Sequence, residues 1–272
     1  MDEKELIKLR EQARDTYRVR TRIPDYKTDQ QLKKPQPPLA KAPMCDTAIP
    51  LPTNYEDLDI DNDFLHVINS RESHRVYTQE QMTLLQLSYL LWCTQGVKTI
   101  RGKSYATLRT VPCGGGRHPF ECYMTVQMVD GLEDGLYHYL PLKHAIEYLG
   151  PKENMRDFIS ASLVGQAWGA KANVVFYYSI VFYRCEWRYG VTASPASRTD
   201  AGHVTENLYL ASTSIGLGGC AVGAIDPALC NEAFGVDGKE EFIFYAMPVG
   251  TISAKDRQAE DDFYAFVREE GL

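Results

Sequence analysis

The segment "TVPCGGGRHPFECYMTVQMV" (residues 110–129) joins three consecutive glycines to a strand-like pattern. In its second half, apolar side chains stand at every second position, which is the period of a β-strand with one buried face. A dinucleotide-binding loop needs a strand before its glycines and a helix after them, and a P-loop needs the pattern GxxxxGK[ST]. Neither pattern is present, because no strand is predicted before the glycines and a strand follows them. The glycines therefore predict that a ligand or another part of the chain lies close to their backbone, just before a strand.

The rest of the chain shows both periodicities, without a regular strand–helix–strand repeat. The turn "DGLEDG" (130–135) predicts a hairpin between the strand above and the next one. Thr78 can cap the first long helix and Gly96 can end it. Helices are predicted over 78–96, 154–170 and 202–219, and further strands over 136–141, 173–183 and 240–250. This combination predicts an α+β fold, in which helices pack on a mostly antiparallel sheet.

Residues 1–55 differ in composition from the rest of the chain. The charged segment 2–21 predicts one short helix, and the segment 33–52 holds six prolines, which exclude a helix or an inner strand there. We interpret residues 1–55 as an extended arm over a protein surface, such as that of a partner subunit. A disordered leader is the alternative. The folded domain is predicted to span residues 56–272.

Charge and composition exclude several classes of function. The chain carries a formal net charge of −7, whereas a general nucleic-acid binder needs a basic surface. No apolar run approaches the roughly 18 residues that a membrane-spanning helix needs. The seven cysteines show no CxxC spacing, and cysteines and histidines do not cluster as metal ligands. These observations predict a cytoplasmic protein without a metal, a membrane anchor or a nucleic-acid partner, which acts on small molecules.

Two basic segments can bind an anion. The side chains of Arg71, Ser73 and Arg75 share one face of an extended chain, and two arginine forks with a hydroxyl suit a phosphate. The alternative for this segment is an exposed basic turn. Lys255 and Arg257, after the last predicted strand, can complete the anion site or stay solvated among neighbouring acids.

Cys113, directly before the glycines, raises a different possibility. A thiol nucleophile there, glycine N–H groups as an oxyanion hole, and His118 or His203 as base would form an acyl transferase. One cysteine with a distant histidine is a weak signal, so a cysteine packed in a turn is the preferred interpretation. A second glycine-rich segment, "GLGGCAVGAIDP" (216–227), is either a helix end with a loop or bare backbone for a flat ligand.

Taken in chain order, these motifs resemble a known family. The pattern R-x-S-x-R, the helix end "LLWCTQG", "PCGGGRHPFE", "GLYHY", "GHVTENLYLAS" with "GLGG", and "PVG" resemble the nitroreductase-like FMN flavoproteins. Within them, the sequence is most similar to the SagB-type dehydrogenase subgroup over about residues 61–250. The resemblance implies an α+β homodimer with FMN in clefts at the subunit interface. It also favours a structural role for the arm.

The resemblance implies roles for particular residues. Arg71, Ser73 and Arg75 would hold the FMN phosphate and ribityl chain, and Lys255 with Arg257 would also reach the phosphate. Two backbone segments would contact the isoalloxazine ring: Pro112, Cys113, Gly114, Gly115 and Gly116 along the ring, and Ala221, Val222, Gly223 and Ala224 near flavin N5.

The implied activity is hydride transfer through flavin N5 in two half-reactions. NAD(P)H is a candidate reductant, and the substrate is an unidentified small molecule or modified peptide. No catalytic residue is assigned, because hydride transfer to a flavin requires no acid–base side chain. A flavin-binding sensor or scaffold subunit without turnover is the alternative function.

Three departures from the family pattern refine this expectation. Cys113 stands where the family has serine, and Gly116 stands where well-studied nitroreductases carry an amide side chain. Azoline-oxidising members of the subgroup often use a Lys-Tyr pair as base, and this sequence has no Lys-Tyr dipeptide. Broad nitroaromatic reduction and peptide azoline oxidation are therefore not favoured.

Overall fold

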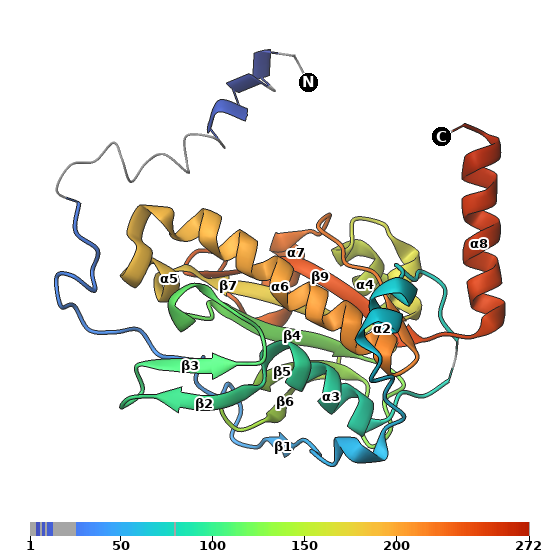
Figure 1. Cartoon of the computed structure of the whole chain (residues 1–272), viewed down its shortest axis with the longest axis horizontal. Helices are drawn as coiled ribbons and strands as arrows, with labels where there is room; N and C mark the ends of the chain where they lie inside the picture. Colours follow the sequence, from blue (N-terminus) through green and yellow to red (C-terminus); the bar gives the residue numbers. More distant parts are fainter. Residues whose placement is uncertain (1–3, 6, 9, 13–25, 79, 272) are drawn as a thin grey trace.

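A seven-stranded antiparallel sheet forms the centre of the protein (Figure 1). The computed structural model describes residues 4–5, 7–8, 10–12, 26–78 and 80–271. The strand order is β1-β6-β5-β4-β7-β9-β8, and each neighbouring pair is antiparallel. The strands are β1 (Ile49–Pro50), β4 (Phe120–Val126), β5 (Gly135–Leu140), β6 (Ala145–Gly150), β7 (Val174–Val181), β8 (Leu217–Gly219) and β9 (Glu241–Thr251). The predicted α+β class with a mostly antiparallel central sheet is confirmed.

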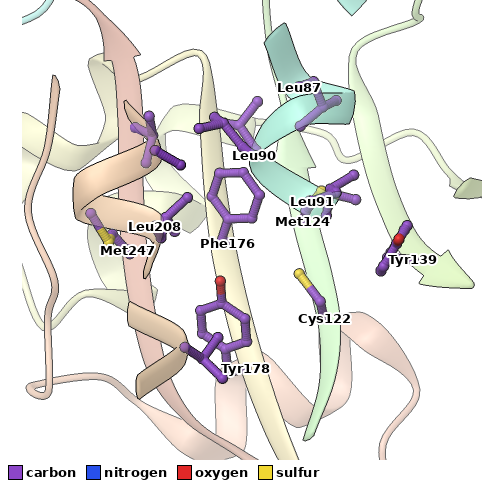
Figure 2. Close-up of a cluster of buried hydrophobic side chains, with 14 of the residues drawn as sticks. Leu87, Leu90, Leu91, Cys122, Met124, Tyr139, Phe176, Tyr178, Leu208 and Met247 are labelled. Atoms are coloured by element: carbon purple, nitrogen blue, oxygen red, sulfur yellow. The ribbon is translucent and has the colours of Figure 1, made fainter. Parts of the chain in front are cut away.

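Two pairs of helices cover the two faces of the sheet. On one face, α3 (Leu84–Gln95) and α6 (Ala193–Ser214) pack on Met124 of β4 and Phe176 of β7 (Figure 2). On the other face, α4 (Met155–Ser162) and α7 (Pro227–Phe234) pack on the neighbouring residues of the same strands. Because side chains alternate along a strand, β4 and β7 supply both cores.

The remaining elements surround this layered centre. A separate hairpin of β2 (Val97–Arg101) and β3 (Ala106–Arg109) precedes β4, and α8 (Ala254–Glu269) extends away from the sheet (Figure 1). The other helices are α2 (Phe64–Ser70) and α5 (Phe182–Tyr189), and the short 3-10 turns are η1 (Tyr55–Asp57), η2 (Gly114–Gly116), η3 (Ala167–Lys171) and η4 (Gly190–Thr192).

The first predicted helix begins later than the sequence indicated. Thr83, and not Thr78, caps α3, because its side chain and that of Gln86 form a reciprocal capping box. Met82 lies just outside the helix, in a parallel bridge with Val129. The predicted end at Gly96 is confirmed by its backbone N–H, which donates to the carbonyl of Trp92.

Two other helices also differ from the prediction. The helix predicted over 154–170 is divided into α4 and η3, because Val164 (φ 56°) and Gly165 (φ 84°) leave the helical region. The helix predicted over 202–219 begins at Ala193 and ends at Ser214, since residues 217–219 pair with β9 as strand β8.

Several elements were missed by the sequence patterns. The strand β3 leads into the glycines, so the prediction that no strand precedes them is wrong. The segment 182–203 folds into α5, η4 and the first residues of α6, none of which the sequence patterns indicated before residue 202. Residues 254–269 form the 16-residue helix α8.

The proline-rich part of the arm lies on this chain's own sheet. The edge strand β1 pairs with β6, which fits its proline because an edge strand needs fewer N–H donors. Backbone N–H groups of Met44 and Cys45 donate to Glu147 Oε2, both at 2.8 Å. In the predicted N-terminal helix, residues 4–5, 7–8 and 10–12 are helical, and its other residues lie outside the described ones. Contact of the arm with a partner subunit stays a prediction.

Buried carboxylates hold this arm and the sheet together. Glu121 on β4 forms an ion pair with Arg184, and its Oε1 accepts the backbone N–H of Lys41 at 2.6 Å. His138 on β5 lies between Glu121 (Nε2–Oε2 3.5 Å) and Glu147 (Nδ1–Oε1 2.6 Å). Burial alone would lower the pKa of His138, but the two neighbouring carboxylates outweigh burial and raise it. The imidazolium form therefore links two carboxylates under the arm.

Within the residues that the structure describes, no helix is both long and apolar enough to cross a bilayer. The same residues contain no group of three or more histidine, cysteine or acidic side chains placed to hold a metal ion.

The raised pKa of His138 predicts a stability loss at alkaline pH. Its pKa is 6.5 in the unfolded chain and higher in the folded protein, so its contribution is complete below pH 6.5 and is lost as the pH rises through the folded value. We expect the free energy of unfolding of the wild type to fall above pH 6.5, by at most about 1.4 kcal/mol per pH unit for this group. Urea unfolding between pH 6.5 and about 9 measures this slope.

His138→Gln should remove most of that slope, whereas His66→Gln should leave it nearly unchanged. His66 also pairs with an aspartate, but that pair is exposed and screened by solvent. Equal slopes in the wild type and His138→Gln would show that His138 is not charged in the folded protein.

Candidate functional site

Three residues from two other segments of the chain meet at Tyr209, on α6. The Tyr209 hydroxyl lies 3.1 Å from Ser73 Oγ and accepts the backbone N–H of Ala221 at 2.7 Å. The guanidinium of Arg71 lies over the tyrosine ring, 5.4 Å from its centroid. Backbone contacts add to this, since Ser73 forms a parallel bridge with Gly219. Arg71, Ser73, Tyr209 and Ala221 are called the Tyr209 cluster below.

The Tyr209 cluster presents the charged guanidinium of Arg71, the hydroxyls of Ser73 and Tyr209, and the backbone of Ala221, which follows strand β8. All four members are partly exposed to solvent. Burial raises the pKa of Tyr209, so its hydroxyl stays protonated at neutral pH and can donate a hydrogen bond. Such a donor set suits a phosphate or another oxyanion.

The other predicted phosphate residues have different surroundings. Arg75 lies over the ring of Trp168, 5.8 Å from its centroid. Lys255 and Arg257 are exposed in the first turn of α8, where a spacing of two residues turns their side chains about 200° apart. Arg71 and Ser73 are the predicted phosphate residues that contact Tyr209 directly.

The predicted N5 segment is only partly available for a ligand. Val222 is buried, and its backbone N–H donates to the Ala246 carbonyl at 2.7 Å. Gly223 and Ala224 are exposed beyond this bridge, and Ala221 belongs to the Tyr209 cluster. The backbone that stays open near the cluster is therefore that of residues 223–224.

The glycine segment, residues 112–116, is anchored to the beginning of α6. Asp200 accepts the Gly114 N–H at 3.0 Å and the Cys113 thiol at 3.1 Å, both at Oδ2. Gly115 and Gly116 have φ values of 60° and 65°, which favour glycine over other residues. Asp200 thus fixes the strand-to-turn transition that the glycines make possible.

The side-chain faces of these glycines are covered by the protein itself. A Cβ on Gly115 would lie 2.5 Å from Arg188 Nε and 2.7 Å from the Tyr189 hydroxyl, and a Cβ on Gly116 would lie 3.2 Å from Ala106 Cβ. The sequence predicted bare backbone for a flavin ring here. The structure adds a second reason for the glycines, which is the close packing of α5 and β3.

Cys113 and the nearby histidines are not arranged as an activated nucleophile. A hydrogen bond with Cys185, burial and the Asp200 carboxylate all raise the pKa of Cys113, so the thiol keeps its proton. Burial and the charge of Arg109 lower the pKa of His118 to about 3. His118 meets the Cys113 sulfur through its backbone N–H, and His203 lies beside Asp200 at 3.6 Å. These contacts argue against the acyl-transferase alternative.

A pocket of about 470 Å³ opens beside the glycine segment. Pro112, Cys113 and Gly116 line one part of it, and Lys98 and Arg109 from the β2–β3 hairpin line another. Its volume is in the range of small-molecule sites.

The Tyr209 cluster and the glycine segment contact opposite faces of α6. Asp200 and Tyr209 are nine residues apart, which places them about 180° apart around the helix and about 13 Å apart along it. The two regions of the predicted site are therefore separated by α6 within one chain.

Sequence reasoning missed both residues that organise these regions. Both belong to the long helix, where Asp200 lies one turn before Val204 on the face of the apolar stripe (Val204, Leu208 and Ala211) and Tyr209 lies beside that stripe. Two sequence signals were available: Tyr209 places an aromatic hydroxyl next to that stripe, and Asp200 places an acidic side chain one turn before it.

Comparison with known proteins agrees with this architecture. The sequence profile of the nitroreductase family matches residues 68–251. Protein MJ1384 of Methanocaldococcus jannaschii, provisionally named a nitroreductase, is 33% identical over 184 residues, which are 68% of this chain and 88% of MJ1384. The trifolitoxin-processing protein TfxB of Rhizobium leguminosarum bv. trifolii is 28% identical over 141 residues, which are 49% of this chain and only 38% of TfxB.

A solved structure has the same fold over nearly the whole chain. It is a chain of the E. coli microcin synthetase complex McbBCD with truncated pro-MccB17 bound. The TM-score is 0.58 at 16% identity, and the match covers 93% of this chain and 95% of that chain.

The packing over Gly115 predicts a steric cost that a control glycine lacks. Gly115→Ala adds a methyl group that collides with Arg188 and Tyr189, whereas Gly131, also at positive φ (77°), has nothing within 4 Å of its Cβ position. We expect Gly131→Ala to lower the free energy of unfolding by about 1–2 kcal/mol, from backbone strain alone. Gly115→Ala should cost about 2–5 kcal/mol, because overpacking is added to the strain. Urea unfolding of both variants measures the difference, and equal losses would contradict the packing of α5 on this glycine.

Proposed function

Because the chain belongs to the nitroreductase family, we propose that it is an FMN-dependent oxidoreductase that works as a homodimer. Family membership rests on the match over residues 68–251, which include the Tyr209 cluster and the glycine segment. The observation that carries the FMN assignment is the convergence of Arg71, Ser73 and Ala221 on Tyr209.

The donor set of this cluster fits a flavin phosphate. Arg71 would supply a charged fork of N–H groups, and Ser73 and Tyr209 would supply neutral hydroxyl donors. When bound, FMN would supply hydride acceptance and donation at its N5 atom. The residues of this chain would bind and orient the cofactor, and Ala221 would fix the backbone that leads to the exposed residues 223–224.

A complete site would need two copies of the chain. The glycine segment would contact the flavin ring, yet it lies across α6 from the Tyr209 cluster. Because the two regions lie on opposite sides of α6 and about 13 Å apart along it, we propose that one copy supplies the Tyr209 cluster and its partner supplies residues 112–116. This arrangement places the cofactor at the interface between the two copies.

Hydride transfer through the flavin would not require a side chain of this site to gain or lose a proton. Cys113 would remain a thiol beside the ring, since Asp200 and burial disfavour its thiolate. NAD(P)H is the proposed reductant, and a small molecule or modified peptide is the proposed substrate. Similarity to TfxB, whose name states a role in trifolitoxin processing, supports membership of the SagB-type subgroup and a peptide-derived substrate.

FMN binding is expected to depend on Arg71. The purified protein should bind FMN and show the yellow flavin absorbance, and NADH or NADPH should bleach that absorbance without oxygen. Arg71→Ala removes a charged contact to the phosphate, which predicts an FMN Kd raised about 10–100-fold. Quenching of flavin fluorescence measures this Kd.

Lys143→Ala is the control, because it removes a positive charge from the exposed β5–β6 turn. It should bind FMN like the wild type. A colourless protein after reconstitution would contradict the proposed function, and unaltered FMN binding by Arg71→Ala would contradict the phosphate assignment. Bound FMN that neither nicotinamide donor reduces would favour a flavin-binding sensor.

Mixed dimers test whether the site is shared between two copies. Pro112 is exposed in the pocket, so Pro112→Trp should block the ring side without disturbing the core. Homodimers of Arg71→Ala or Pro112→Trp should bind little FMN. A mixed dimer, purified through two different tags, should regain one intact site and about half of the wild-type FMN content. No recovery in the mixed dimer would place both segments in the same copy.

A further inference from the structure

Most buried charges of this protein have a partner of opposite sign. Arg184 pairs with Glu121, His138 pairs with Glu147, and Lys41 pairs with Glu241 at 2.7 Å. Burial of an ion is costly unless a counterion or strong hydrogen bonds replace water, so this pairing is expected.

Arg109 departs from that pattern. Its side chain is 4% exposed, and among the described residues it makes no ion pair. Its hydrogen-bond acceptors are all neutral: Gln95 Oε1 at 2.6 Å, Thr107 Oγ1 at 3.2 Å and the Leu39 carbonyl at 3.2 Å. Burial lowers its pKa to about 10, so the guanidinium is charged at neutral pH. The charge of Glu121 reaches Arg109, but Arg184 and His138 already neutralise that carboxylate.

The surroundings of Arg109 add positive charge. Arg117 donates to the carbonyls of Gly115 and Tyr105, and Arg188 donates to the Tyr105 hydroxyl, so both also bond neutral acceptors. Asp200 is the carboxylate of this region, and it is engaged by Cys113 and Gly114. A chain with a net charge of −7 thus concentrates cations around the glycine segment.

We propose that the pocket beside the glycine segment binds a carboxylate of the substrate, with Arg109 as its anchor and Lys98 at its edge. Both residues line the same 470 Å³ pocket, together with Thr107, Thr110 and Cys113. As a substrate site this rests on the proposed function, whereas the binding of the carboxylate itself does not require FMN.

A carboxylate fits this pocket better than the cofactor phosphate does. The guanidinium fork of Arg109 matches the two oxygens of a carboxylate, and a single buried cation balances a monoanion. The proposed phosphate residues, Arg71 and Ser73, lie on the other face of α6 from the glycine segment. Residues 112–116 would place the carboxylate next to the ring.

Benzoate and benzamide are the probes, because they share a shape and differ in charge. Thermal unfolding of the FMN-loaded wild type should shift upward with benzoate and not with the same concentrations of benzamide. Arg109→Gln should raise the benzoate Kd at least tenfold, as expected for loss of a charged hydrogen bond. Arg101→Gln, an exposed arginine on the same hairpin, should bind benzoate like the wild type.

A second variant and an FMN titration complete the test. Lys98 is exposed, so Lys98→Gln should fold normally and weaken benzoate binding by up to about fivefold. Arg109→Gln should keep wild-type FMN affinity. Equal responses to benzoate and benzamide, or benzoate binding unaffected by both variants, would overturn the carboxylate site. Loss of FMN affinity in Arg109→Gln would overturn it as well, by assigning this arginine to the cofactor.

Protein that carries no FMN separates this inference from the proposed function. Benzoate should still stabilise the FMN-free wild type and not FMN-free Arg109→Gln. If FMN does not bind but this difference persists, the oxidoreductase proposal fails and the carboxylate pocket stands.

Discussion

The packing of α6 across the central sheet is the constraint on which the candidate site depends. Val204, Leu208 and Ala211 bury one stripe of this helix against β4 and β7, and that burial fixes the rotation of the helix about its axis. With the rotation fixed, Tyr209 faces the Arg71–Ser73 segment and Asp200 faces the glycine segment. One buried stripe therefore positions two polar regions on opposite faces, and this arrangement is the physical reason for proposing a site shared between two copies.

Buried charge organises the other half of the structure. Three carboxylates on the sheet, Glu121, Glu147 and Glu241, bind both the arm and the cations beneath it. These pairs leave Arg109 as a buried cation with neutral acceptors at the pocket beside the glycine segment. The ion pairs hold the scaffold together, whereas the Arg109 guanidinium keeps its charge without a counterion among the described residues.

The sequence predicted most of the sheet and its class, because alternating apolar residues mark β4 and a continuous apolar run marks β7. Helix ends were less predictable, since a capping box at Thr83 and a positive φ at Val164 leave weak sequence signals. The neighbourhood of Arg71 and Ser73 was predictable because an R-x-S pattern on extended chain is local, whereas their binding of a phosphate stays a prediction. Tyr209 and Asp200 were missed because their partners are distant in sequence. The cover of α5 over Gly115 likewise depends on tertiary packing that no local pattern encodes.

The central claim is that α6 divides the cofactor site between two copies of this chain. A crystal structure of the protein grown with FMN tests it most directly. We predict a dimer in which the FMN phosphate contacts Arg71 and Ser73 of one copy and the ring lies beside residues 112–116 of the other. A flavin bound by both segments of the same copy, or bound away from the Tyr209 cluster, would contradict the account.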